Sequence, residues 1–211
     1  MEKTTHLIEN WEEQLINVLE DIARKFRSKD YKIINEVNIG DYIRDGFLEQ
    51  YPNSSMEVWP ETTWFEKIAN SGYYVDRAIM DTSKTKFIYS DDAGIEKNIE
   101  VKKFNKQFFH DDLAIAIELK YLREKNCPYD KVVDDYKKIH KIQEALDYRF
   151  KRGLYKVLNS RTWRGFVVCG CETEEIYSSM VQRFKMLIES IPATAQQKVF
   201  VFGPNKSEFI C

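Results

Sequence analysis

The order of its periodic segments is the feature that most limits how this 211-residue chain can fold. Two segments near the N-terminus, 6–27 and about 39–49, repeat apolar residues at helical spacing. Strand-like runs follow at 56–65, 73–81, 86–90, 99–104, 112–121, 165–171 and 198–203, with further helical segments beginning near 127 and at 176. This order predicts an α/β (α+β) fold in which helices flank a central mixed β-sheet.

The length of the chain and the absence of a linker, repeat or low-complexity tract predict a single domain spanning 1–211. We divide it into an N-terminal helical part at 1–50, a core at about 56–170, and a C-terminal helix and strand at 171–211. The runs 86–90 and 99–104 flank an Asp-Asp-Ala-Gly turn at 91–94, which predicts a hairpin.

Composition predicts a cytoplasmic protein. Charged residues make up 31% of the chain, and no run approaches the ~20 apolar residues of a membrane span. The N-terminal segment is acidic and lacks an apolar signal-peptide region. The cysteines Cys127, Cys169, Cys171 and Cys211 form no disulfide-type pattern. A net charge of -2 neither indicates nor excludes a nucleic-acid partner, for which a local basic face is enough.

The strand at 112–121 has two very different faces. Side chains alternate along a strand, so Ile115, Ile117 and Leu119 share an aliphatic face with Leu113. The other face carries Ala114, Ala116, Glu118 and Lys120. Because buried charges are costly without partners, this face predicts either an ordinary Glu–Lys pair near solvent or a functional site.

A second acidic residue lies inside a strand. Asp76 is in the run 73–81, on the face shared by Tyr74, Ala78 and Met80, although strand interiors are depleted in aspartate. If this strand neighbours 112–121, Asp76 and Glu118 can converge. Two carboxylates suit a hard divalent ion such as Mg2+, and a nearby lysine can orient a water nucleophile.

These residues resemble the PD-(D/E)XK nuclease superfamily, the restriction-endonuclease-like fold. The resemblance rests on Asp76, the Glu118-Leu119-Lys120 triplet and the following helical segment YDKVVDDYKKI, and it covers roughly residues 36–170. It implies that Asp76, Glu118 and the main-chain carbonyl of Leu119 bind Mg2+, for which Mn2+ can substitute. It also implies that Lys120 serves the attacking water, with the 86–104 hairpin as an insertion.

Several assignments stay open in the sequence. An additional acid is expected from an earlier element, with Glu61 as the first candidate beside Glu57, Glu49 and Glu36. Asp81 is an alternative to Asp76 as the metal ligand. The triplet His110-Asp111-Asp112 is interpreted as the polar start of the strand, although Asp111 or Asp112 could line a cleft.

Clusters of basic residues are candidates for contacts with DNA phosphates. The candidates are Lys102, Lys103, Arg152, Arg161 and Arg164, with a further lysine group at 137, 138 and 141. Solvated surfaces produce the same pattern.

We expect a Mg2+-dependent DNA endonuclease that acts on double-stranded DNA, of the type II restriction class and working as a homodimer. A repair, recombination or defence nuclease that reads DNA structure is the alternative within the same chemistry. An interaction module on the same fold, without catalysis, is the alternative from another class.

Overall fold

A computed structural model describes residues 2–54, 56–66, 71–81, 106–109, 114–125, 127–151 and 163–211. The helices are α1 (Glu2–Arg27), α2 (Glu36–Gln50), α3 (Tyr129–Lys151) and α5 (Glu174–Ser190). The strands are β1 (Met56–Glu66), β2 (Ser71–Asp81), β3 (Lys106–Phe109), β4 (Ala114–Leu122), β5 (Trp163–Cys171), β6 (Gln197–Phe202) and β7 (Ser207–Phe209). The hairpin expected at 86–104 lies outside the described residues.

The strands form one mixed sheet in the order β3-β1-β2-β4-β5-β6-β7, which confirms the predicted fold class. β2 runs antiparallel to both β1 and β4. β4, β5 and β6 are parallel to one another, and α3 and α5 are the helices between them in the chain. β7, which the sequence did not predict, adds an antiparallel strand beside β6.

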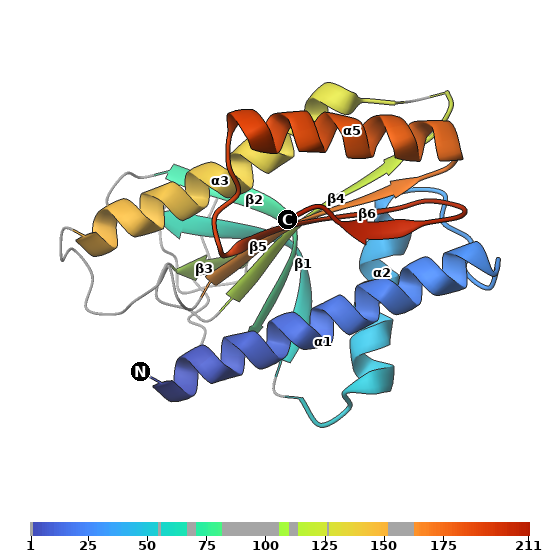
Figure 1. The fold of residues 1–211 in the computed structure, drawn as a ribbon. Helices are drawn as coiled ribbons and strands as arrows, with labels where there is room; N and C mark the ends of the chain where they lie inside the picture. Colours follow the sequence, from blue (N-terminus) through green and yellow to red (C-terminus); the bar gives the residue numbers. More distant parts are fainter. Residues whose placement is uncertain are drawn as a thin grey trace, which may run out of the picture.

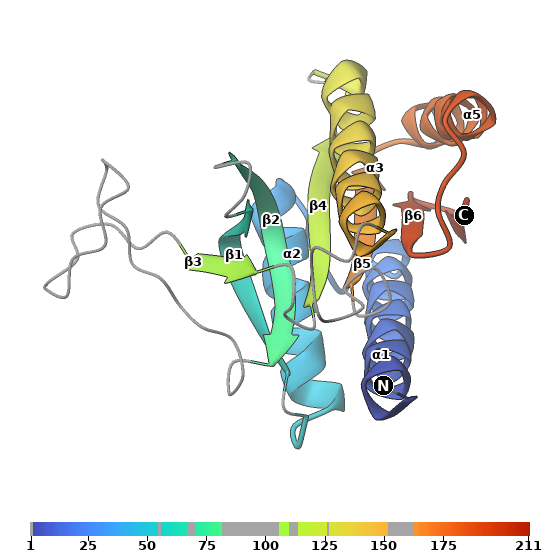
Figure 2. The ribbon, with the colours of Figure 1, turned by 90° about the vertical axis from the view of Figure 1, so that its left-hand side faces the viewer.

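Helices cover both faces of the sheet. Figure 1 shows α3 and α5 on one face and α1 with α2 on the other, and Figure 2 shows α3 running alongside β4. The predicted division of β4 is confirmed: Ile115, Ile117 and Leu119 pack in the core shared with α1 and α2. Ala116 packs in the core shared with α3 and α5. The Glu118 side of β4 therefore faces α3.

Local signals explain where the helices lie and begin. The predicted stripe of α1 is buried, with Ile8, Trp11, Leu15, Val18, Leu19 and Ile22 at helical spacing. α2 begins at Glu36, earlier than predicted, because the Asn35 side chain accepts a hydrogen bond from the Asn38 backbone nitrogen at 3.1 Å. Thr173 caps α5 in the same way through the nitrogen of Ile176.

β1 is continuous through Pro60, although proline commonly interrupts a strand. Proline lacks a backbone donor and is tolerated where a strand has no neighbour on that side. Pro60 pairs with Arg77 of β2, whereas the described pairing with β3 begins only at Thr62. The next residue, Glu61, has a φ of 43°, a left-handed conformation that is uncommon outside glycine.

The close packing of α3 on the sheet depends on the missing side chain of Gly165. A Cβ atom there would lie 2.4 Å from Ile139 Cγ2 and 2.8 Å from the Trp163 ring. We expect Gly165→Ala to lower the free energy of unfolding by about 1–3 kcal/mol, because an overfilled core must shift. Urea unfolding of the variant, beside the exposed control Ser178→Ala, measures this. Equal stability of the two variants would show that α3 moves aside freely.

Among the described helices, none is long and apolar enough to cross a membrane. Cys169 and Cys171 are free thiols buried in the core.

Candidate active site

The pairing of β2 with β4 brings the two predicted carboxylates together. Arg77 pairs with Ile117 and Ala78 with Ala116, so the same register places Asp76 across from Glu118. Residues opposite each other in an antiparallel pair share a face of the sheet. The Asp76 Oδ2 atom also accepts a hydrogen bond of 2.7 Å from the Leu119 backbone nitrogen. This bond fixes the aspartate beside the Glu118-Leu119-Lys120 triplet.

The Lys120 side chain also lies beside Asp76. Its Nζ atom lies 4.0 Å from Asp76 Oδ2 and donates a hydrogen bond of 3.0 Å to the Leu119 carbonyl oxygen. A closer partner is Asp135 of α3, whose Oδ2 atom is 2.9 Å away. Asp135 therefore holds the ammonium group of Lys120 close to the carboxylates.

α3 contributes two charged residues that the sequence did not assign to the site, Asp135 and Lys138. Lys138 Nζ lies 2.7 Å from Glu118 Oε1 and 3.6 Å from Asp135 Oδ1. It also donates a hydrogen bond of 3.0 Å to the Tyr74 carbonyl oxygen of β2. Both residues border the buried stripe of α3 that contains Tyr136 and Ile139. That position is the only sequence signal that they face the sheet, and a solvated helix surface produces the same pattern.

Burial and charge shift the protonation of the site. Glu118 is only 1% exposed. Burial, followed by the charge of Asp76, raises the pKa of Glu118 to about 8, against the opposing effect of Lys138. Burial acts to lower the pKa of Lys120, but the close ion pair with Asp135 and the charges of the other nearby carboxylates outweigh it and raise that pKa. Lys120 therefore stays charged at neutral pH.

The donor set fits a hard divalent ion. Glu118 Oε1 and Asp135 Oδ2 are buried and lack a partner with hydrogen-bond geometry, although lysine nitrogens lie within 2.9 Å of each. The two ion pairs therefore leave lone pairs of these oxygens unused. The described ranges contain no group of three Asp, Glu, His or Cys side chains placed as a metal centre. Mg2+ does not need three such side chains, because it keeps several of its waters. Its protein ligands would be Asp76, Glu118 and the Leu119 carbonyl.

Among the proposed additional acids, Glu61 is the best placed. β1 pairs Pro60 with Arg77 and Thr62 with Val75, which puts the exposed Glu61 at the level of Asp76. By contrast, Glu57 accepts a hydrogen bond from Trp59. Glu49 pairs with Lys25 on the α1 side, and Glu36 lies in the first turn of α2. Asp81, the alternative to Asp76, is the last residue of β2.

Arg164 does not lie on the surface, as its prediction as a DNA contact requires. Its side chain is buried, and its Nε atom lies 2.6 Å from Glu12 Oε2 of α1. This pair joins α1 to β5, so Arg164 is a structural residue and lacks the exposure that a phosphate contact needs. The other proposed DNA contacts, Lys102, Lys103, Arg152 and Arg161, lie outside the described residues, as do His110, Asp111 and Asp112.

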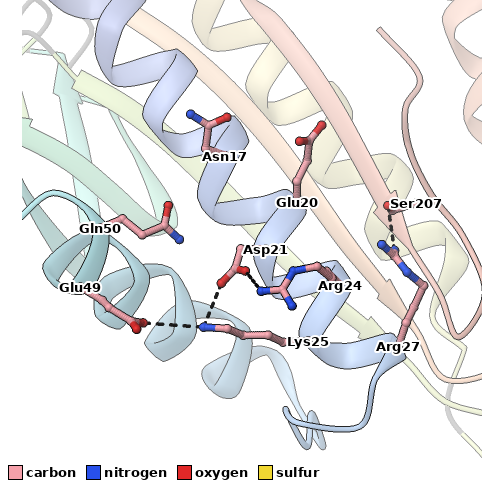
Figure 3. A pocket seen from close by; sticks show the side chains of 9 residues that line it. All are labelled: Asn17, Glu20, Asp21, Arg24, Lys25, Arg27, Glu49, Gln50 and Ser207. Carbon is pink, nitrogen blue, oxygen red and sulfur yellow. Dashed lines mark hydrogen bonds and ion pairs between the residues drawn. The ribbon is translucent and has the colours of Figure 1, made fainter.

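A large open groove of about 750 Å³ lies elsewhere, between α1, the end of α2 and β7. Figure 3 shows that its basic side chains already have partners. Lys25 pairs with Asp21 and Glu49, and Arg27 donates a hydrogen bond to Ser207. α1 and α2 cover the face of the sheet opposite α3, so this groove is separate from the carboxylate site.

No protein-family model, curated protein or solved structure matches the chain.

Proposed function

We propose that this chain is a Mg2+-dependent DNA endonuclease of the PD-(D/E)XK type. One observation carries the proposal: the β2–β4 register sets Asp76 beside Glu118, with Lys120 Nζ 4.0 Å from Asp76. Two strands far apart in sequence thus supply the two carboxylates and the lysine that the motif requires. The sequence pattern alone could not have placed them on one face.

The topology around the site supports the same assignment. The resemblance implies a mixed sheet with one helix before and one after the catalytic strands. Here α2 precedes the antiparallel strands β1, β2 and β4, and α3 connects β4 to the parallel strand β5. The site lies where β2, β4 and α3 meet.

The chain's own residues have distinct roles in the proposed hydrolysis. Asp76, Glu118 and the Leu119 carbonyl would hold the ion, which when bound lowers the pKa of a water and stabilises charge on the phosphate. The Lys120 ammonium orients the attacking water and offsets the negative charge that develops during attack. Asp135 positions Lys120 and keeps it protonated. Glu61, at the level of Asp76, is the proposed additional acid.

The proposed substrate is double-stranded DNA, and the proposed biological class is a type II restriction enzyme. Two strands must be cut, so a symmetric homodimer would place one site at each strand. A repair, recombination or defence nuclease would use the same site but would read DNA structure in place of sequence.

The direct test is cleavage of supercoiled plasmid and phage DNA by the purified protein with Mg2+, Mn2+ or EDTA. We expect cleavage with either ion and none in EDTA, because the carboxylates act only through the metal. A Lys120→Met preparation, purified in parallel, controls for contaminating nucleases.

The products separate the proposed classes. Discrete fragments indicate a sequence-specific enzyme, whereas a smear or a preference for branched DNA indicates a repair or defence nuclease. If duplex, single-stranded and branched DNA all stay intact, catalysis is overturned and the non-catalytic interaction module replaces it.

A further inference from the structure

Lys138 occupies a position lined by oxygen atoms and shares Glu118 with the proposed metal site. Its Nζ atom lies 2.7 Å from Glu118 Oε1, 3.0 Å from the Tyr74 carbonyl oxygen and 3.6 Å from Asp135 Oδ1. The three oxygens come from β4, β2 and α3. Two carboxylates and a main-chain carbonyl are the ligand types that hard cations prefer. The ammonium group therefore lies where the chain presents cation ligands.

The formal charges of the cluster favour a divalent ion in place of Lys138 over an ion added beside it. In the ionised form that binds a metal, Asp76, Glu118 and Asp135 supply three negative charges, while Lys120 and Lys138 supply two positive ones. If a divalent ion joined all five groups, the cluster would carry an excess positive charge. If the ion replaced Lys138, the three carboxylates would be balanced by the ion and Lys120. Uncompensated charge in a buried site is costly, so the second arrangement is favoured.

Lys120 and Lys138 differ in what holds them. Lys120 Nζ is bound to Asp135 and to the Leu119 carbonyl, and it lies 4.0 Å from Asp76. Lys138 is the lysine in direct contact with Glu118, and that contact lacks hydrogen-bond geometry at Oε1. Lys138 is also a long side chain on a helix, so rotation about its own bonds can carry the ammonium to solvent.

We infer that Lys138 is an internal counter-ion that competes with the divalent metal for Glu118 and is displaced when the metal binds. The inference rests on the proposed metal site and adds a regulatory step to it. In the metal-free chain, Lys138 contacts Glu118 of β4 and the Tyr74 carbonyl of β2, and so holds α3 against both strands. After displacement, its ammonium is released beside the site, where it can contact a DNA phosphate.

The test follows the lysine directly in the wild-type protein. Side-chain ammonium groups of 15N-labelled lysines are observed by NMR at low temperature when hydrogen bonds protect them from exchange with water. Lys138→Arg, which keeps the positive charge, assigns the Lys138 signal by its loss. Lys141→Arg is the matched control one turn along α3, because Lys141 is exposed. The Leu119 backbone amide, hydrogen bonded to Asp76, reports the arrival of Mg2+.

Three outcomes decide the matter. We expect Mg2+ to shift the Leu119 amide and to abolish the Lys138 ammonium signal while the Lys120 signal persists. If the Leu119 amide shifts and the Lys138 signal remains, the displacement is overturned and the proposed metal site stands. If Mg2+ changes neither signal, both the displacement and the metal site are overturned.

Discussion

Lys120→Met should lower the rate of Mg2+-dependent DNA cleavage by about 100- to 1000-fold, the loss that follows removal of one preorganised charge-stabilising group. Methionine keeps most of the side-chain volume but cannot orient the water or offset negative charge. Asp76 and Glu118 are unchanged, so Mg2+ should still bind. Single-turnover cleavage and calorimetric Mg2+ titration of the same preparation measure the two properties separately.

Two further variants serve as controls for Lys120→Met. Asp76→Asn removes a ligand and should abolish both cleavage and Mg2+ binding. Lys141→Met changes an exposed lysine of α3 and should leave both unaltered. Because Lys120→Met also leaves Asp135 without its nearest cation, circular dichroism must show that the variant is folded. Full cleavage activity in folded Lys120→Met would place the chemistry at another site.

Glu118→Gln should change how the stability of the metal-free protein depends on pH. The pKa of Glu118 is raised from an ordinary value near 4.5 to about 8, mainly by burial. The folded state therefore binds a proton more tightly than the unfolded state does. This tighter proton binding stabilises the folded wild type in full below about pH 4.5. The stabilisation is lost as the pH rises to about 8.

Glutamine remains neutral across this range, so the stability of Glu118→Gln should not show this decrease with rising pH. From pH 5 to pH 9, the free energy of unfolding of the wild type should fall relative to the variant by roughly a few kcal/mol. Urea unfolding with EDTA at several pH values measures the difference, with Glu189→Gln on the exposed face of α5 as control. Parallel pH curves for wild type and Glu118→Gln would contradict a raised pKa at Glu118.

The sequence predicted the parts of this molecule that depend on regular alternation. The aliphatic and charged faces of 112–121 became the two faces of β4, because a strand covered on both sides must satisfy both cores at once. Asp76 could be singled out because aspartate inside a strand requires a special reason. The register that sets it across from Glu118 depends on the whole sheet and was visible only in the structure.

Other features had no such signal. Asp135 and Lys138 lie on a helix rich in charged residues, and only packing shows which of these residues face the sheet. Arg164 looked like part of a basic surface, but its partner Glu12 lies 152 residues away in the chain. The left-handed backbone of Glu61, which lies between Pro60 and the start of the β3 pairing, likewise had no signal in the sequence.

The site is assembled across very unequal lengths of chain, which has a consequence for the order of folding. Lys120 and Asp135 come from successive elements, whereas the Asp76–Leu119 hydrogen bond closes a separation of 43 residues. Contacts between nearby segments cost less chain entropy to form than distant ones. A partly folded chain would hold its lysine before its aspartate, and strand closure would complete the set. The proposed hydrolysis would therefore require the complete sheet, because only the folded molecule brings the aspartate and the lysine together.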